Sequence, residues 1–165
     1  MNRPRMIRIV AMAATAMLAT LSVGSPALAA RKAHHAPVVA DRDHDGMPDT
    51  WERANGLNTR RNDASADRDR DGLTNIQEFV THTSPRRSDT NHNRVSDANE
   101  DPDHDGLTNR QEFVVHDNPL SADSDHDGVT DGNDDSDGDG HSDHDEFASG
   151  HNPNEPDDDA ADDER

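Results

Sequence analysis

The sequence predicts a mostly irregular repeat protein in which short acidic loops alternate with short helical turns, after an N-terminal signal helix. Three observations lead to this fold class. One twelve-residue acidic pattern occurs six times, beginning at positions 41, 67, 89, 101, 123 and 135. Only 28% of the residues are hydrophobic and 2% aromatic, too few to offset the entropy of ordering the backbone around an apolar core. The chain has no cysteine, so disulfides cannot replace that core.

The first 29 residues have the pattern of a secretory signal peptide. Arg3, Arg5 and Arg8 form a basic start, residues 9–23 are apolar and rich in alanine, and residues 27–29 (Ala-Leu-Ala) form a small-x-small cleavage site. The apolar stretch is too short to span a membrane comfortably. We therefore expect a secreted, extracellular or cell-surface protein with no membrane span after cleavage, in which residues 30–40 form a flexible linker.

The repeated pattern predicts a calcium loop. Asp or Asn stands at positions 1, 3 and 5, Gly stands at position 6 in five copies, Asp or Asn at 9, and an acid at 12. Oxygen atoms on alternating residues, a sharp turn and a closing carboxylate form a cage for a hard cation, to which position 7 adds its backbone carbonyl. Where no site exists in the unfolded chain, the free energy of metal binding becomes folding free energy. We expect about five or six Ca²⁺ ions to order the chain.

The six loops differ in how well they fit this pattern. Position 9 is Asn in the loops starting at 67 and 101, and the loop starting at 123 closes with Asp rather than Glu. The loop 89–100 has two Asn ligands and has Arg94 at the glycine position, so it is either a weak site or a spacer. The predicted metal ligands are Asp41, Asp43, Asp45, Met47, Asp49, Glu52; Asp67, Asp69, Asp71, Leu73, Asn75, Glu78; Asp89, Asn91, Asn93, Val95, Asp97, Glu100; Asp101, Asp103, Asp105, Leu107, Asn109, Glu112; Asp123, Asp125, Asp127, Val129, Asp131, Asp134; and Asp135, Asp137, Asp139, His141, Asp143, Glu146.

The spacing of the loops predicts a repeat region over residues 41–153. From residue 67 the spacings of 22 and 12 sum to a 34-residue unit, and the run DGLTN at 71–75 recurs at 105–109. Tetratricopeptide repeats have a similar period, but they need continuous apolar helix faces that this chain lacks. No residue separates loop 89–100 from loop 101–112, or loop 123–134 from loop 135–146, which excludes paired EF-hands with two helices around each loop. Neighbouring carboxylates at these junctions, such as Asp134 and Asp135, are predicted to link successive cations.

Helical turns are expected only after some loops. Asn75 and Asn109 are predicted N-caps of short helices at 76–80 and 110–115, and Asp49 is predicted to cap a turn that Gly56 ends. Such helices are marginal alone in water. The apolar side chains expected to pack locally against the loops are Trp51, Leu57, Leu73, Phe79, Leu107, Phe113, Val129 and Phe147. Residues 154–165 are predicted to form a disordered acidic tail.

Other chemistries fit the sequence less well. A formal charge of −20 disfavours nucleic acid as a partner, and enzymatic activity is not expected because no apolar pocket or nucleophile arrangement is apparent. Of the eleven histidines, His44, His92, His104 and His126 stand at loop position 4, where side chains should face solvent. The pair His34-His35 invites a transition-metal interpretation, but exposed surface residues are the better one.

The loop motif, its connectors and the unequal spacing together resemble the thrombospondin type 3 repeat family in its bacterial form. The resemblance covers roughly residues 41–153 and rests on Asp-x-Asp-x-Asp-Gly-x-x-Asp-x-x-Glu units alternating with Glu-Phe…Pro connectors. It implies calcium binding through the loop aspartates, little regular secondary structure and a secreted or surface location. Vertebrate members carry disulfides, which this chain cannot form, so metal alone would have to hold it together.

These expectations combine into a secreted calcium-binding repeat protein whose loops fold and stiffen on binding. A cell-surface or extracellular matrix spacer that supports adhesion, with an extracellular protein or surface as its partner, is the leading hypothesis. A calcium-dependent docking module similar to dockerins is one alternative, although dockerins have two loops with helices. An acidic calcium buffer is another.

Overall fold

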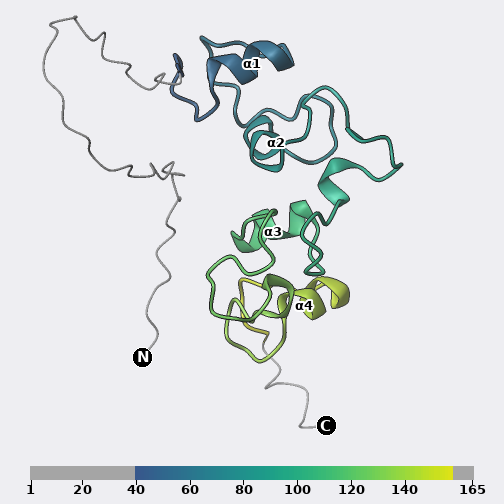
Figure 1. The fold of residues 1–165 in the computed structure, drawn as a ribbon. Coiled ribbons are helices and arrows are strands. Elements are labelled where there is room, and N and C mark those ends of the chain that lie inside the picture. Colours follow the sequence, from purple (N-terminus) through teal and green to yellow (C-terminus); the bar gives the residue numbers. More distant parts are fainter. Residues whose placement is uncertain (1–39, 158–165) are drawn as a thin grey trace, which may run out of the picture. The chain divides into compact units, whose positions relative to one another are not determined.

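A computed structural model describes residues 40–157, and within this range it contains short helices and no strand (Figure 1). The elements are α1 (Asp49–Asn55), α2 (Asn75–Thr81), η1 (Asp97–Asn99), α3 (Asn109–Val115), η2 (Asp131–Asn133) and α4 (Asp143–Ser149). Each α-helix has seven residues and each η element is a three-residue 3₁₀ turn. The expectation of a mostly irregular chain with little regular secondary structure is confirmed. The predicted signal peptide, linker residues 30–39 and tail residues 158–165 lie outside the described residues. Residues 154–157 of the predicted acidic tail are described, and there the Asp157 N–H donates to Asp139 Oδ2 at 2.8 Å.

Every helix or turn begins at position 9 of an acidic loop. We call the loops starting at 41, 67, 101 and 135 the helix loops, because an α-helix (α1, α2, α3 or α4) begins within each of them. The loops starting at 89 and 123 are the turn loops, because only a 3₁₀ turn (η1 or η2) begins within each of them. Short helices at 76–80 and 110–115 are confirmed within a residue at each end, whereas α4 was not anticipated.

The predicted N-caps at Asp49, Asn75 and Asn109 are each wrong by one residue. Pro48 is the N-cap of α1, without a side-chain hydrogen bond, and in α2 and α3 the residue before each asparagine has this role. Thr74 and Thr108 are the N-caps, with extended backbone angles. In α3 the Thr108 hydroxyl accepts from the Gln111 N–H at 3.4 Å, and Gln111 Oε1 accepts from the Thr108 N–H at 2.9 Å. This reciprocal pair is a capping box, which satisfies two N–H groups at the helix start. The asparagine side chains are therefore free to point into the loops.

All four helices end at a residue in the left-handed conformation. Gly56 (φ 70°) ends α1, as predicted, and Gly150 (φ 84°) ends α4. His82 and His116 hold the same conformation after α2 and α3, at φ 61° and 71°. A left-handed residue at this point lets its N–H bond back to the last helical carbonyls and stops the helix after two turns.

The buried interior is more acidic than apolar. Among the described residues, five hydrophobic side chains and eleven polar or charged ones are buried. Position 7 contributes Met47, Leu73 and Leu107, all 0% exposed, in loops followed by an α-helix. In the turn loops the same position holds Val95 and Val129, both 41% exposed, so the expectation that Val129 packs against its loop is wrong. A three-residue turn offers too little surface to cover that side chain.

One aromatic contact joins two helices. The rings of Trp51 in α1 and Phe79 in α2 meet edge to face with centroids 5.2 Å apart, an arrangement favoured by the aromatic quadrupole. Leu73 and Leu107 are buried as predicted.

No helix among residues 40–157 has both the length and the apolar character needed to cross a membrane.

Candidate metal sites

All six loops share one backbone frame. The N–H of position 6 donates to the position-1 carboxylate at 2.9–3.3 Å. The N–H of position 7 donates to the position-5 side-chain oxygen at 2.7–3.0 Å. The N–H of position 9 donates to the carbonyl of the residue just before the loop at 2.7–3.1 Å. These bonds close each loop into a ring. Both oxygens of the position-1 carboxylate accept backbone N–H groups of their own loop, so the loop backbone fixes the orientation of that carboxylate.

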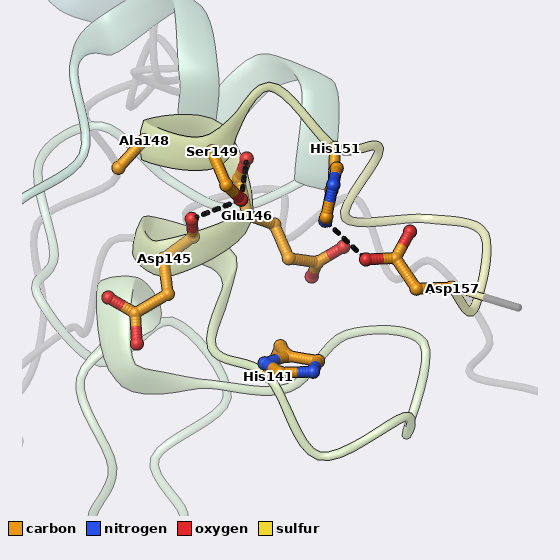
Figure 2. Close-up of a pocket in the computed structure, with 7 residues that line it drawn as sticks. All are labelled: His141, Asp145, Glu146, Ala148, Ser149, His151 and Asp157. Atoms are coloured by element: carbon orange, nitrogen blue, oxygen red, sulfur yellow. Dashed lines mark hydrogen bonds and ion pairs between the residues drawn. The ribbon is translucent and has the colours of Figure 1, made fainter. Parts of the chain in front are cut away.

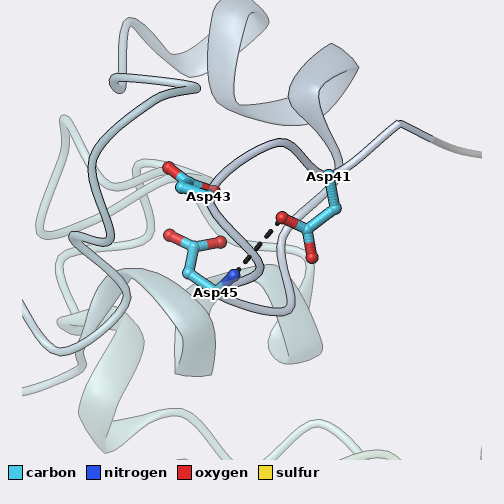
Figure 3. A group of neighbouring side chains, drawn as sticks. All are labelled: Asp41, Asp43 and Asp45. Atoms are coloured by element: carbon cyan, nitrogen blue, oxygen red, sulfur yellow. Dashed lines mark hydrogen bonds between the residues drawn. The ribbon is translucent and has the colours of Figure 1, made fainter.

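Within three of the helix loops, the carboxylates of positions 1, 3 and 5 converge. Figure 3 shows Asp41, Asp43 and Asp45 around one point, with the Asp45 N–H donating to Asp41 Oδ1 at 3.3 Å. One oxygen from each lies within 4.8 Å of the others. The same holds for residues 67, 69 and 71 and for residues 101, 103 and 105. Each of these acidic groups could hold a metal ion.

The position-12 glutamate of every helix loop is buried without a hydrogen-bond partner. Glu52, Glu78 and Glu112 are 0% exposed and Glu146 is 1% exposed. Neither carboxylate oxygen of any of the four accepts a hydrogen bond within the described chain. A buried carboxylate left unpaired costs several kcal/mol, on the order expected for an ion taken out of water. These four glutamates therefore need a positive partner if they stay buried and charged.

A further carboxylate comes to these sites from outside the loop. Asp63 joins Asp45 and Glu52, and Asp131 joins Asp105 and Glu112, in groups whose oxygens lie within 4.8 Å of one another. Sequence reasoning did not identify Asp63 as a site residue and assigned Asp131 only to its own loop.

Backbone contacts hold these incoming acids in place. The Asp63 N–H donates to Asp45 Oδ2 at 3.4 Å, and the Asp157 N–H donates to Asp139 Oδ2 at 2.8 Å. In both cases the acid follows position 5 by 18 residues, a regularity that could have revealed Asp63 and Asp157 in the sequence. The helix loops at the two ends of the repeat region thus receive their extra acid in the same way.

The turns η1 and η2 lie close to the two middle helix loops, which start at 67 and 101. Gly132 in η2 donates its N–H to Asp105 Oδ2 at 3.0 Å. Burial raises the pKa of Glu78 most, the charges of Asp69 and Asp71 raise it further, and Asp97 in η1 lies close enough to add to that rise. The turns also contact the next helix, η1 against α3 and η2 against α4. A turn loop therefore connects the helix loop before it with the helix loop after it.

The electrostatics of the buried glutamates reflect this crowding. Burial, and then the charges of neighbouring aspartates, raise the pKa of Glu52 and Glu146 to about 7 and the pKa of Glu78 and Glu112 to about 9. Two like charges about 4 Å apart repel by about 1 kcal/mol in bulk water and about 4 kcal/mol at the effective dielectric near a protein surface. A divalent cation among these oxygens would convert that repulsion into attraction.

The side chain at position 9, a predicted ligand, makes a second hydrogen bond that stabilises the loop. Where it is Asp, its carboxylate accepts from the position-2 backbone N–H at 2.8–3.1 Å, at residues 49, 97, 131 and 143. Where it is Asn, the side-chain amide donates to a carbonyl: Asn75 to Asp63 at 2.9 Å and Asn109 to Asp97 at 2.7 Å. The amide oxygens of Asn75 and Asn109 are buried and accept no hydrogen bond within the described chain.

The first turn loop satisfies its closing glutamate internally. Asn91 Nδ2 and Asn93 Nδ2 both donate to Glu100 Oε1, at 2.6 and 2.8 Å. Their amide oxygens accept the backbone N–H groups of Asn93 and Val95 at 2.9 and 2.7 Å, which orients each amide with its nitrogen toward Glu100. Arg94 occupies the glycine position at φ 76°. In this loop, unlike the helix loops, two amide donors occupy the side that faces the glutamate.

The second turn loop is open to solvent. Asp125 and Asp127 are exposed, whereas Asp131 is buried and accepts from the Ser124 N–H and hydroxyl, both at 2.8 Å. At the junction with the next loop, the Asp135 N–H donates to Asp134 Oδ1 at 3.3 Å. This loop therefore keeps three acids at positions 1, 3 and 5 without a covered interior.

The position-4 histidines are exposed, as predicted: His44, His92, His104 and His126. Each has a positive φ of 59–65°, so position 4 is a left-handed residue between two ligand positions.

No protein-family model matches this chain, and neither a curated protein nor a solved structure matches it. Fold and site together define a mostly irregular chain whose acidic groups could hold metal ions.

Proposed function

We propose that this chain is a secreted calcium-binding repeat protein, of the thrombospondin type 3 kind, whose helix loops fold around Ca²⁺. The observation that carries the proposal is the set of four buried position-12 glutamates, which have no hydrogen-bond partner within the described chain and face aspartates. A cation among these oxygens supplies the missing partner and removes the repulsion. Binding is thereby coupled to local folding.

The donor set supports calcium over other common cations. Around the first helix loop it comprises oxygens only: the carboxylates of Asp41, Asp43, Asp45, Glu52 and Asp63. Ca²⁺ takes six to eight oxygen ligands in flexible geometry, whereas Mg²⁺ demands a near-ideal octahedron and keeps several waters. Oxygen-rich sites also disfavour softer transition metals. Irregular loops rich in carboxylates therefore suit Ca²⁺ best.

The contacts between loops support a role in which calcium stiffens the chain. Asp63 and Asp157 each reach back 18 residues to a helix loop, and η2 reaches back 27 residues to Asp105. An ion that gathers these acids orders the connector as well as the loop. We infer that the calcium-loaded chain acts as a spacer at a cell surface or in an extracellular matrix, and that the four helix loops are its strongest sites.

The test is a calcium titration of the purified chain by calorimetry and native mass spectrometry, with Mg²⁺ as the competing ion. Glu112→Gln keeps the shape of the side chain and removes its charge, and should remove one calcium ion or weaken its binding by at least about tenfold, equivalent to ~1.4 kcal/mol. Glu155→Gln, the same change at an exposed residue, is the matched control. Equal calcium binding by the wild type and Glu112→Gln would reject the proposal.

The spacer role has its own measurement. Small-angle scattering with and without calcium should show a change in the maximum dimension of the chain if the loops stiffen it. Equal dimensions in both states would favour a simple buffer. Pull-down from an extracellular extract, with and without calcium, separates a docking module from both.

A further inference from the structure

The last helix loop and its connector are built like the first. Residues 135–157 align with residues 41–63 without a gap, and both connectors reach back to position 5 through the same backbone bond. Both helices, α1 and α4, end at a left-handed glycine. The two units therefore offer a position-by-position comparison within one chain.

Two apolar residues of the first unit are histidines in the last. Met47, which is 0% exposed, corresponds to His141, and Leu57 corresponds to His151. In the units that contain α2 and α3, position 7 is leucine. The residue after the left-handed histidine that ends the helix is Thr83 in the unit of α2 and Asp117 in the unit of α3. Among the six loops, only this last one has a histidine at position 7 and a second histidine just after the left-handed residue that ends its helix.

Both histidines border the buried glutamate of the last loop. Figure 2 shows the Glu146 carboxylate directed into the space between His141 and the pair of His151 and Asp157. His151 Nδ1 contacts Asp157 Oδ2. Glu146 is 1% exposed, and neither of its oxygens accepts a hydrogen bond within the described chain. These residues line an open cavity of about 490 Å³.

The backbone holds these groups together. Asp139 accepts the His141 N–H through Oδ1 at 2.9 Å and the Asp157 N–H through Oδ2 at 2.8 Å. One carboxylate thus fixes the backbone beneath both sides of the cavity. The placement of an imidazole on one side and an imidazole–carboxylate pair on the other follows from the fold of this unit.

Two imidazoles with two carboxylates form a different donor set from the oxygen-only groups elsewhere. Nitrogen from His and oxygen from Asp or Glu are common Zn²⁺ ligands, and imidazole also suits copper and nickel. We propose that this cavity binds one divalent transition-metal ion, for which Zn²⁺ is the test ion, through His141, Glu146, His151 and Asp157. This inference concerns a second kind of ion, which would share Glu146 with the last helix loop and so compete there with Ca²⁺, and it does not rest on calcium binding by the other helix loops.

The test is a Zn²⁺ titration of the purified, untagged chain by calorimetry, repeated at several calcium concentrations up to the millimolar range, because the two ions share Glu146. The double variant His141→Met/His151→Leu installs the residues of the first unit, so its fold should survive, which circular dichroism checks. The matched control is His34→Ala/His35→Ala, which removes the adjacent histidine pair near the other end of the sequence. Visible absorption of added Co²⁺ provides a second readout, because nitrogen ligands change its spectrum.

We expect the wild type and the His34/His35 control to bind one Zn²⁺ that the His141/His151 variant loses. The loss should exceed the roughly 10- to 100-fold weakening typical of removing an outer-shell partner of a metal site. Unchanged Zn²⁺ binding in the His141/His151 variant, or no Zn²⁺ binding by the wild type, would overturn the inference. Calcium stoichiometry is counted separately by native mass spectrometry, so failure of this site is distinguishable from failure of the calcium proposal.

Discussion

The backbone N–H of Gly132 donates to Asp105 Oδ2 at 3.0 Å although 27 residues separate the two along the chain. This bond brings η2, a part of one loop, to the acidic group of another. Asp131, the residue before Gly132, lies with Asp105 and Glu112 in a group whose oxygens are within 4.8 Å. The loop starting at 101 is therefore completed by a residue that the sequence pattern assigns to the loop starting at 123.

Asp131→Asn should weaken the cation site of the loop starting at 101. The substitution preserves size but removes one of the negative charges around Glu112, and ligand charge is a main determinant of calcium affinity. We expect calcium to bind there at least about tenfold more weakly, or by ~1.4 kcal/mol. Native mass spectrometry across a calcium titration measures this. Asp145→Asn, on the exposed face of α4, is the control, and equal loss in both variants would show that net charge alone is responsible.

Gly132→Ala should lower the melting temperature of the calcium-loaded chain. A Cβ at this residue would lie 2.6 Å from the Asp105 carbonyl oxygen, too close for any relaxed contact, so η2 must move away from the loop. We expect a loss of roughly 1–3 kcal/mol, as for other overpacked sites. Ala98 occupies the corresponding position of η1. An unchanged melting temperature would contradict this prediction. It would mean that η2 can move slightly farther from its helix loop, as η1 does to accommodate Ala98.

Asn91→Asp combined with Asn93→Asp should create a cation site in the first turn loop. Each change replaces an amide donor to Glu100 by a carboxylate oxygen, so attraction becomes repulsion until a cation binds. We expect one additional Ca²⁺ by native mass spectrometry, with Arg94→Gly strengthening its binding by relieving the left-handed backbone. Asn99→Asp, an exposed change in η1, adds charge without facing Glu100 and should add no ion. Unchanged stoichiometry in the double variant would contradict this explanation.

The calcium-free chain should lose order as the pH rises. The four buried glutamates have folded-state pKa values of about 7 or about 9, against an ordinary value of 4.5. Between these limits the folded state binds more protons than the unfolded state, so stability is fully present below about pH 4.5 and is lost as the pH rises toward 7 to 9. Circular dichroism and amide exchange at pH 5 and pH 8 without calcium measure this.

Calcium should reverse that dependence. An ion among the carboxylates displaces their protons, so its affinity should increase from pH 5 to pH 8 and binding should release protons. Calorimetry in two buffers of different ionisation enthalpy counts the released protons. Calcium affinity that does not change with pH would mean that these glutamates are not ligands.

Local pattern was enough to predict the loops and most of the helices. Alternating oxygens at positions 1, 3 and 5 and the turn at position 6 are set by residues within one loop, so their geometry follows from the sequence. The short helices of the first, second and fourth loops follow from equally local signals. The N-caps at Thr74 and Thr108 were missed because asparagine is also a good cap, and only the contact of Asn75 with Asp63 shows that its side chain is engaged elsewhere.

Sequence alone shows that the chain is poor in apolar residues, that it carries six acidic loops, and where each loop begins and ends. The tertiary contacts establish which loops are covered. They also show that Asp63, which belongs to no loop, and Asp131, which belongs to another loop, complete two of the helix loops, and that Asn91 and Asn93 turn their amide nitrogens toward Glu100. This difference follows from distance along the chain. A loop of twelve residues encodes its own ring of hydrogen bonds, whereas burial of its closing glutamate depends on contacts formed 18 to 27 residues away, which no local pattern specifies.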